Sequence, residues 1–85
     1  MEDIIGEVRK FLRENFMLDE SVKLEPGTSF IDNHVLDSTG FMELIGFIEE
    51  RFGVQVRDEE MVPENFDSLG NVERYVARKR SEVAT

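Results

Sequence analysis

Length, composition and charge exclude several classes of protein. A chain of 85 residues has room for one small domain, residues 1–85, and so small a core weighs against the deep cleft of a self-sufficient enzyme. A formal net charge of −9, from 19 acidic and 10 basic side chains, argues against nucleic-acid binding, and the lack of cysteine excludes disulfides and thiolate nucleophiles.

The first predicted element is an amphipathic helix over residues 3–16. Asp3 is placed to cap this helix, and Glu7 lies near the positive end of the helix dipole. The apolar residues of the segment recur with the spacing of one helical face. They are Ile4, Ile5, Val8, Phe11 and Leu12.

A long loop is predicted next, over residues 17–37. The segment has no sustained period and contains the turn signal Pro26-Gly27. A loop of about 20 residues is unusual in a small domain, so we expect apolar side chains to hold it on the core. They are Leu18, Val22, Leu24, Phe30, Ile31, Val35 and Leu36.

A second helix is predicted from Ser38 to Phe52, and Gly53 is placed to end it. Its core stripe consists of Phe41, Leu44, Ile45, Ile48 and Phe52. The outward side and its flanks carry Thr39, Met42, Glu43, Gly46, Glu49 and Glu50. An acidic face of this kind can serve only for solubility, or it can steer basic partners toward the protein.

The remaining sequence predicts a short helical turn before Pro63 and a last helix from Ser68 to about Arg80, followed by a frayed end. The expected fold is therefore all-α: a small four-helix bundle of three longer helices and one short helix, ordered over about residues 3–80. No apolar run is long enough to span a membrane, and the acidic N-terminus does not resemble a signal peptide. We expect a cytoplasmic monomer that does not bind membranes.

Two similar tetrapeptides stand at predicted helix starts, Asp37-Ser38-Thr39-Gly40 and Asp67-Ser68-Leu69-Gly70. A capping role explains either serine, because serine is among the preferred N-cap residues. For Ser68 this role is sufficient: its hydroxyl is placed to accept from the backbone N–H of Gly70 or Asn71.

Ser38 has surroundings that a cap does not explain. It closes the long acidic loop and opens the helix with the acidic outward face. The N–H groups and dipole at a helix start favour a phosphate ester on a neighbouring hydroxyl. Asp37 offers a carboxylate that can share a divalent cation with an incoming phosphate donor, and Gly40 is expected to keep the approach open. Context thus favours Ser38 as the chemical handle.

The segment "VLDSTGFMELIGFIEERFGVQV" resembles the central part of acyl carrier proteins. It has Leu-Asp-Ser, then a helix of the form x-x-Glu-Leu-x-x-x-x-Glu-x-x-Phe-Gly, then a short hydrophobic link. "RDEEM" is similar to the short third helix of that family, and "FDSLGNVERYV" is similar to the start of its last helix. The resemblance spans nearly the whole chain and is most specific over residues 30–76.

The resemblance implies a carrier and not an enzyme. A separate phosphopantetheinyl transferase would attach 4′-phosphopantetheine to Ser38, beside Asp37, using coenzyme A and magnesium. The thiol of the cofactor would then carry an acyl or aminoacyl group as a thioester, delivered by loading ligases or synthases with basic patches. The same resemblance assigns partner contacts to the outward side of the second helix and an acyl groove to its inner edge. The partner residues are Thr39, Met42, Glu43, Gly46, Glu49 and Glu50, and the groove residues are Phe41, Ile45 and Met61.

Thr39 and Gly46 depart from typical fatty-acid carriers, which have leucine and a larger apolar residue at these positions. We therefore expect a specialised stand-alone carrier, with D-alanyl and other aminoacyl carriers as close matches. The alternative is an acidic helical interaction module without a prosthetic group.

Two other site types are disfavoured by the residues. A serine–histidine catalytic pair would need suitable geometry, an oxyanion hole and an orienting acid, and a lone loop histidine such as His34 is far more often structural or solvated. An EF-hand loop counted from Asp32 places His34 and Leu36 at ligand positions and Asp37 at the obligatory glycine. The sequence therefore predicts no catalytic residue and no resident metal.

Overall fold

The computed structural model describes residues 3–16 and 24–84, with side chains up to Ser81. The described chain forms the helices α1 (Ile4–Asn15), α2 (Ser38–Phe52), α3 (Pro63–Phe66) and α4 (Leu69–Ala84), with a 3₁₀ turn, η1, at Asp58–Glu60. The described residues contain no strand, so the predicted all-α fold is confirmed.

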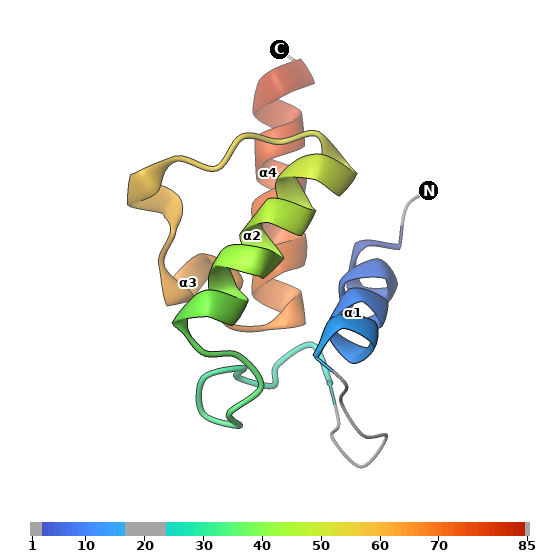
Figure 1. Ribbon diagram of the computed structural model, residues 1–85. Helices are drawn as coiled ribbons and strands as arrows, with labels where there is room; N and C mark the ends of the chain where they lie inside the picture. Colours follow the sequence, from blue (N-terminus) through green and yellow to red (C-terminus); the bar gives the residue numbers. More distant parts are fainter. Residues whose placement is uncertain (1–2, 17–23, 85) are drawn as a thin grey trace.

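Three longer helices enclose the core (Figure 1). In this view α2 crosses in front of α4, α1 lies beside α2, and the link after α2 arches over to α3. Val8 and Leu12 of α1, Leu44 and Ile48 of α2, and Val72 of α4 are completely buried. Packing of these apolar faces is the main source of stability in a bundle, because isolated helices of this length are marginal in water.

The ends of the helices follow the capping residues. Asp3 Oδ1 accepts a hydrogen bond from the backbone N–H of Gly6 at 2.9 Å, as an N-cap should. At the end of α2, Gly53 adopts the left-handed conformation with φ 67°, and its N–H donates to the carbonyl oxygen of Glu49. Both roles were predicted, and both are confirmed.

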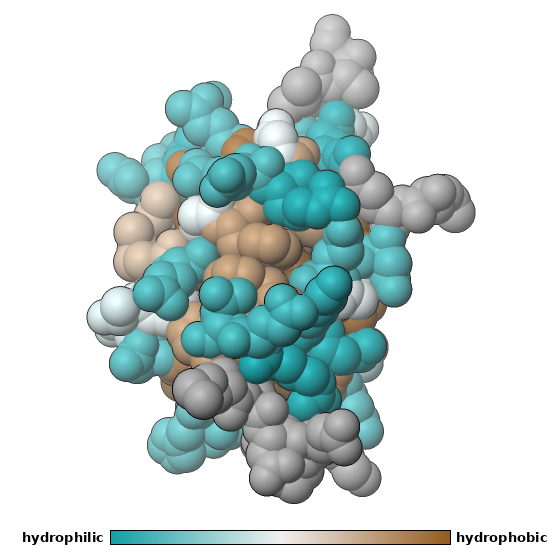
Figure 2. All heavy atoms as spheres, turned by 45° about the vertical axis from the view of Figure 1, so that its right-hand side comes forward, coloured by the Kyte–Doolittle hydropathy of each residue, from teal (hydrophilic) through white to brown (hydrophobic). Residues whose placement is uncertain are grey.

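Aromatic residues join α1 to α2. The rings of Phe11 and Phe47 stack with centroids 4.2 Å apart, and an ion pair between Glu7 and Arg51 spans the same two helices. Figure 2 shows the side of the molecule turned forward from Figure 1, where apolar surface lies in the centre of the face and hydrophilic side chains border it. Both rings are only partly buried, so this seam reaches the surface.

The second tetrapeptide fastens the long loop to α4. Asp67 accepts hydrogen bonds from the Ser29 hydroxyl at 2.5 Å and from the Ile31 N–H at 2.9 Å. Its carbonyl oxygen accepts from the N–H of Phe30 at 2.7 Å, and the N–H of Gly70 donates to the Pro26 carbonyl at 2.9 Å. The repeat of the motif therefore has a structural task beyond helix capping.

Most of the described apolar loop residues are buried, as predicted: Leu24, Phe30, Val35 and Leu36. The prediction was wrong for Ile31, which is 43% exposed. Leu18 and Val22 lie outside the described residues.

The predicted helical turn before Pro63 is confirmed as η1, but the sequence analysis missed the short helix α3 that Pro63 begins. A proline is tolerated at the first helical position because it gives up only an N–H that has no partner inside the helix. One predicted boundary was wrong: helix α4 continues to Ala84 instead of ending near Arg80, since residues 81–84 contain no glycine or proline. Among the described residues, no helix is both long and apolar enough to cross a membrane.

Candidate functional site

Ser38 is the first residue of α2 and is not its cap. Asp37 has extended backbone angles, and its Oδ1 accepts a hydrogen bond from the N–H of Gly40 at 2.7 Å. The expectation that Ser38 could cap the helix was therefore wrong, because Asp37 already holds that position. The Ser38 side chain is exposed, and the described residues offer its hydroxyl no hydrogen-bond partner.

Ser68 has the opposite surroundings. It is only 7% exposed, and its hydroxyl accepts a hydrogen bond from the N–H of Asn71 at 3.2 Å. Phe66 is buried beside Tyr75, with ring centroids 4.8 Å apart, and closes the start of α4. The predicted capping role of Ser68 is confirmed. Two serines in the same local motif thus differ in accessibility and in the use of their hydroxyl groups.

Gly40 does not keep the approach to Ser38 open, contrary to expectation. It is buried, and a Cβ atom at this position would lie 3.0 Å from Leu36 Cδ2 and 3.2 Å from Phe16 Cε1. The glycine allows the start of α2 to pack closely against the end of α1 and the loop.

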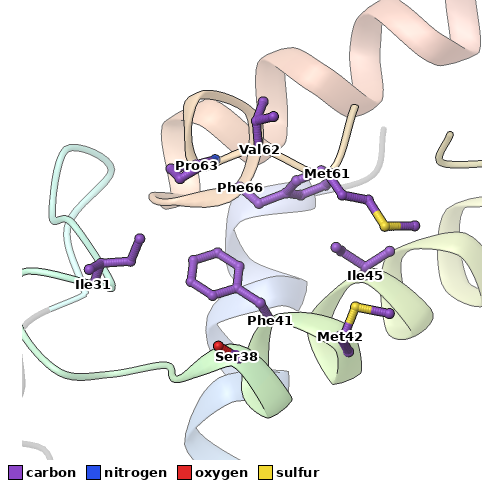
Figure 3. A pocket seen from close by; sticks show the side chains of 9 residues that line it. All are labelled: Ile31, Ser38, Phe41, Met42, Ile45, Met61, Val62, Pro63 and Phe66. Carbon is purple, nitrogen blue, oxygen red and sulfur yellow. The ribbon is translucent and has the colours of Figure 1, made fainter. Parts of the chain in front are cut away.

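An apolar cavity of about 270 Å³ opens beside Ser38. The residues predicted for an acyl groove, Phe41, Ile45 and Met61, all line it. Figure 3 shows the Ser38 hydroxyl near the Phe41 ring, with Met61 and Ile45 farther along the cavity. The remaining wall residues are Ile31, Met42, Val62, Pro63 and Phe66.

The rim of this cavity gathers exposed apolar side chains. Met42 is 57% exposed, Ile31 43% and Val62 37%, and these are the large apolar residues that are exposed in the described part of the chain. Exposed apolar residues that gather around one opening indicate a binding surface. Sequence reasoning missed Ile31, which it placed in the core, and Val62, which lies in a segment without a periodic pattern.

A second hollow lies on the other side of the attachment sequence. It has a volume of about 440 Å³, and its polar lining residues include His34, Asp37, Thr39 and Glu43. His34 is exposed and has a positive φ of 56°, which a non-glycine residue rarely adopts. Within the described chain, no three potential metal ligands lie close enough to hold an ion.

The outward face of α2 is where the sequence placed it. Thr39, Met42, Glu43, Gly46 and Glu50 are exposed. A Cβ atom on Gly46 would meet nothing within 4 Å, so no packing inside the molecule requires glycine there.

Glu49 differs from the other acidic residues of this helix. It is partly buried, and its Oε2 accepts a hydrogen bond from the N–H of Val56 at 3.0 Å. This bond fastens the extended link after α2, so part of the carboxylate is already engaged.

A cluster around Glu60 lies behind the far wall of the cavity. Its carboxylate accepts hydrogen bonds from the Tyr75 hydroxyl at 3.1 Å and from Lys79 Nζ at 3.1 Å. Partial burial alone would raise the pKa of Glu60, but the bonds from the Arg57 N–H, Lys79 and Tyr75 lower it below the ordinary value of 4.5. Burial and the nearby Glu60 carboxylate raise the pKa of Tyr75. The Tyr75 hydroxyl therefore stays protonated and can donate its hydrogen bond to Glu60.

Comparison with known families accounts for this arrangement. A family described as "Phosphopantetheine attachment site" matches residues 6–76, which include the exposed serine, the capping serine and the apolar cavity. Domains of this family carry phosphopantetheine on a serine, work with partner enzymes such as transferases and synthases, and are not catalytic themselves. The chain therefore belongs to the phosphopantetheine-attachment family and is a carrier protein, not an enzyme.

Proposed function

We propose that Ser38 is the attachment serine and that the protein presents a thioester-linked cargo to partner enzymes. The observation that carries this proposal is the contrast between the two serines. Ser38 is exposed, with a hydroxyl that no described residue engages, whereas Ser68 is buried and caps α4. Only Ser38 also lies at the mouth of the apolar cavity.

The start of α2 suits a phosphate ester on Ser38. The Asp37 side chain accepts a hydrogen bond from the N–H of Gly40, and its carbonyl oxygen accepts one from the N–H of Phe41. The N–H groups of Ser38 and Thr39 remain for an anion, and the helix dipole favours negative charge there. The exposed Asp37 carboxylate has a second oxygen with which to share a divalent cation with the incoming coenzyme A. When bound, the prosthetic group supplies the thiol that the chain itself lacks.

The outward face of α2 is proposed as the surface for partner enzymes. Glu43 and Glu50 are exposed there beside Thr39, Met42 and Gly46, and Glu49 adds charge at the edge. Basic patches on a phosphopantetheinyl transferase, a loading ligase or a synthase would complement this surface. Such charge complementarity mainly raises association rates and fixes orientation. Contacts of this kind suit a carrier, which has to leave each enzyme after its turn.

The cavity favours an aliphatic acyl cargo over an aminoacyl cargo. Apart from Ser38, its lining consists of apolar residues, and it offers no carboxylate to pair with a charged amino group. Burying an unpaired charge in such a place is costly, whereas each buried methylene group contributes about 0.8 kcal/mol. The earlier expectation of an aminoacyl-type carrier therefore receives no support from the cavity.

The attachment proposal is tested by incubating the protein with coenzyme A and a broad-specificity phosphopantetheinyl transferase, followed by intact mass measurement. We expect one phosphopantetheine addition on the wild type, none on Ser38→Ala and one on Ser68→Ala. No addition to the folded wild type would leave the rival, an acidic interaction module without a prosthetic group. Addition to Ser38→Ala would place the attachment site elsewhere.

A further inference from the structure

The wall of the cavity opposite α2 has little support of its own. It consists of Met61, Val62 and Pro63, which follow the 3₁₀ turn η1 at Asp58–Glu60. None of the residues of η1 is buried, and Val62 and Pro63 are exposed. Met61 is the one of the three that packs, partly buried, against the core, so specific contacts contribute much of what holds this segment in place.

Glu60 supplies these contacts. Its Oε1 accepts hydrogen bonds from the Tyr75 hydroxyl and from Lys79 Nζ, both at 3.1 Å, and from the Arg57 N–H at 3.0 Å. Its carbonyl oxygen accepts from Asn65 Nδ2 at 2.8 Å. One residue therefore connects η1 with Asn65 of α3 and with the middle of α4.

The partners of Glu60 are themselves firmly placed. Tyr75 is 1% exposed and Lys79 is 9% exposed. Tyr75 also packs against Phe66, which lines the cavity from the same side. The anchor thus joins the cavity wall to the buried part of α4.

We propose that Glu60 is a positioning residue: by fixing the Met61–Val62 wall against α2, it sets which acyl chains the cavity retains. This inference rests on the proposed function, because it assigns the cavity to the cargo. Glu60 does not line the cavity and acts through the residues that directly follow it. Removing its carboxylate leaves the Tyr75 hydroxyl and the Lys79 ammonium without this partner, and both then favour water over their present positions. The wall is released while the α2 side of the cavity keeps its packing.

The first experiment needs no prosthetic group. Methyl-labelled methionine spectra of the unloaded protein report on Met61 in the released wall and on Met42 in α2. In Glu60→Ala we expect the Met61 signal to shift or broaden and the Met42 signal to stay near its wild-type position. Glu59→Gln, an exposed acid in the same 3₁₀ turn, is the matched control and should leave both signals in place. An unchanged Met61 signal in Glu60→Ala would overturn the positioning role, whatever the fate of the carrier proposal.

The second experiment measures retention of the cargo. Acetyl, octanoyl and dodecanoyl forms are made from the matching coenzyme A thioesters, and cleavage by hydroxylamine is followed by mass. In the wild type the octanoyl thioester should be cleaved more slowly than the acetyl thioester. In Glu60→Ala the octanoyl thioester should be cleaved about tenfold faster than in the wild type, which corresponds to roughly 1.4 kcal/mol. The acetyl form should be cleaved at the wild-type rate.

Two further variants separate positioning from general stability. Ser68→Ala weakens the cap of α4 without touching η1, so it should keep the chain-length dependence even where its stability falls. Glu60→Gln keeps the acceptor for Tyr75 and Arg57 and should restore most of the protection.

The possible failures are distinguishable. Equal loss of protection in Glu60→Ala and Ser68→Ala would show a merely structural role for Glu60. Equal cleavage of all wild-type thioesters would overturn the acyl assignment of the cavity, and failure to load Ser38 would overturn the carrier proposal itself.

Discussion

The hydroxyl groups of Ser38 and Ser68 have the same chemistry, and their neighbours decide how each is used. At the first tetrapeptide, Asp37 takes the capping position and leaves the serine hydroxyl free of described partners. At the second tetrapeptide, Asp67 is bound to the loop through Ser29 and Ile31, and the serine caps α4 instead. The aspartate therefore caps the helix in the first tetrapeptide, and the serine caps it in the second.

This reversal predicts that the two alanine substitutions differ in their effect on the free energy of unfolding. Ser68→Ala removes a cap and should lower the free energy of unfolding by about 1 kcal/mol. Ser38→Ala removes an exposed hydroxyl and should change it by less than about 0.5 kcal/mol. Urea denaturation followed by circular dichroism measures both values. A larger loss in Ser38→Ala than in Ser68→Ala would contradict the assignment.

At the scale of the elements, α2 combines a face that packs with a face that is open to partners. Gly40 and Gly46 sit on different faces of this helix and give a matched pair of substitutions. Gly46→Ala adds a methyl group that meets nothing within 4 Å, so it should raise the free energy of unfolding by roughly 1 kcal/mol. Gly40→Ala places the methyl group 3.0 Å from Leu36 Cδ2 and should lower it by about 1–3 kcal/mol. Urea denaturation tests both predictions, provided that the variants unfold with the same dependence on urea concentration as the wild type. A loss of stability in Gly46→Ala would show that the helix needs the glycine for its own packing.

The Gly46→Ala variant also tests the partner surface. If enzymes approach α2 closely at Gly46, the stabilised Gly46→Ala variant should be a poorer substrate for the transferase, with a raised KM. Unchanged kinetics would remove Gly46 from the contact surface.

The elements also show how far the sequence could predict the structure. The caps at Asp3 and Ser68 and the end of α2 at Gly53 follow from local patterns, because helical period and capping act over a few residues. The groove residues Phe41, Ile45 and Met61 were instead predicted from the resemblance to acyl carrier proteins. The far wall could not be predicted in this way. Val62 and Pro63 lie in a segment without a period, and Glu60 is joined to Tyr75 and Lys79 across 15 and 19 residues of sequence. Contacts of that separation leave no periodic signal in a single chain.

For the whole molecule, the free energy of unfolding depends on pH, and Glu60 is the acidic residue whose contribution the structure identifies. Its pKa is lowered in the folded protein, so the unfolded chain binds a proton more readily at this position. The contribution of Glu60 to stability is therefore present above the ordinary pKa of 4.5 and is lost as the pH falls through the folded value. The Lys79 ammonium, the Tyr75 hydroxyl and the backbone N–H of Arg57 face this carboxylate.

The stability difference between wild type and Glu60→Gln should accordingly be largest at neutral pH and should narrow below pH 4.5. Denaturation at a series of pH values measures this difference, with exposed Glu59→Gln as the control, for which the difference should stay small throughout. A difference that grows on acidification would contradict the role of the ionised carboxylate.

The bonds from Asp67 and Gly70 to the long loop have a consequence for the timing of maturation. The loop that leads into Ser38 gains its native shape only when residues 67–70 are present to bind it, and these are synthesised about 30 residues after the serine. While the chain emerges from the ribosome, the serine is already made but its surroundings are not. A transferase that recognises the shaped loop and α2 together would therefore modify the finished protein and pass over the nascent one.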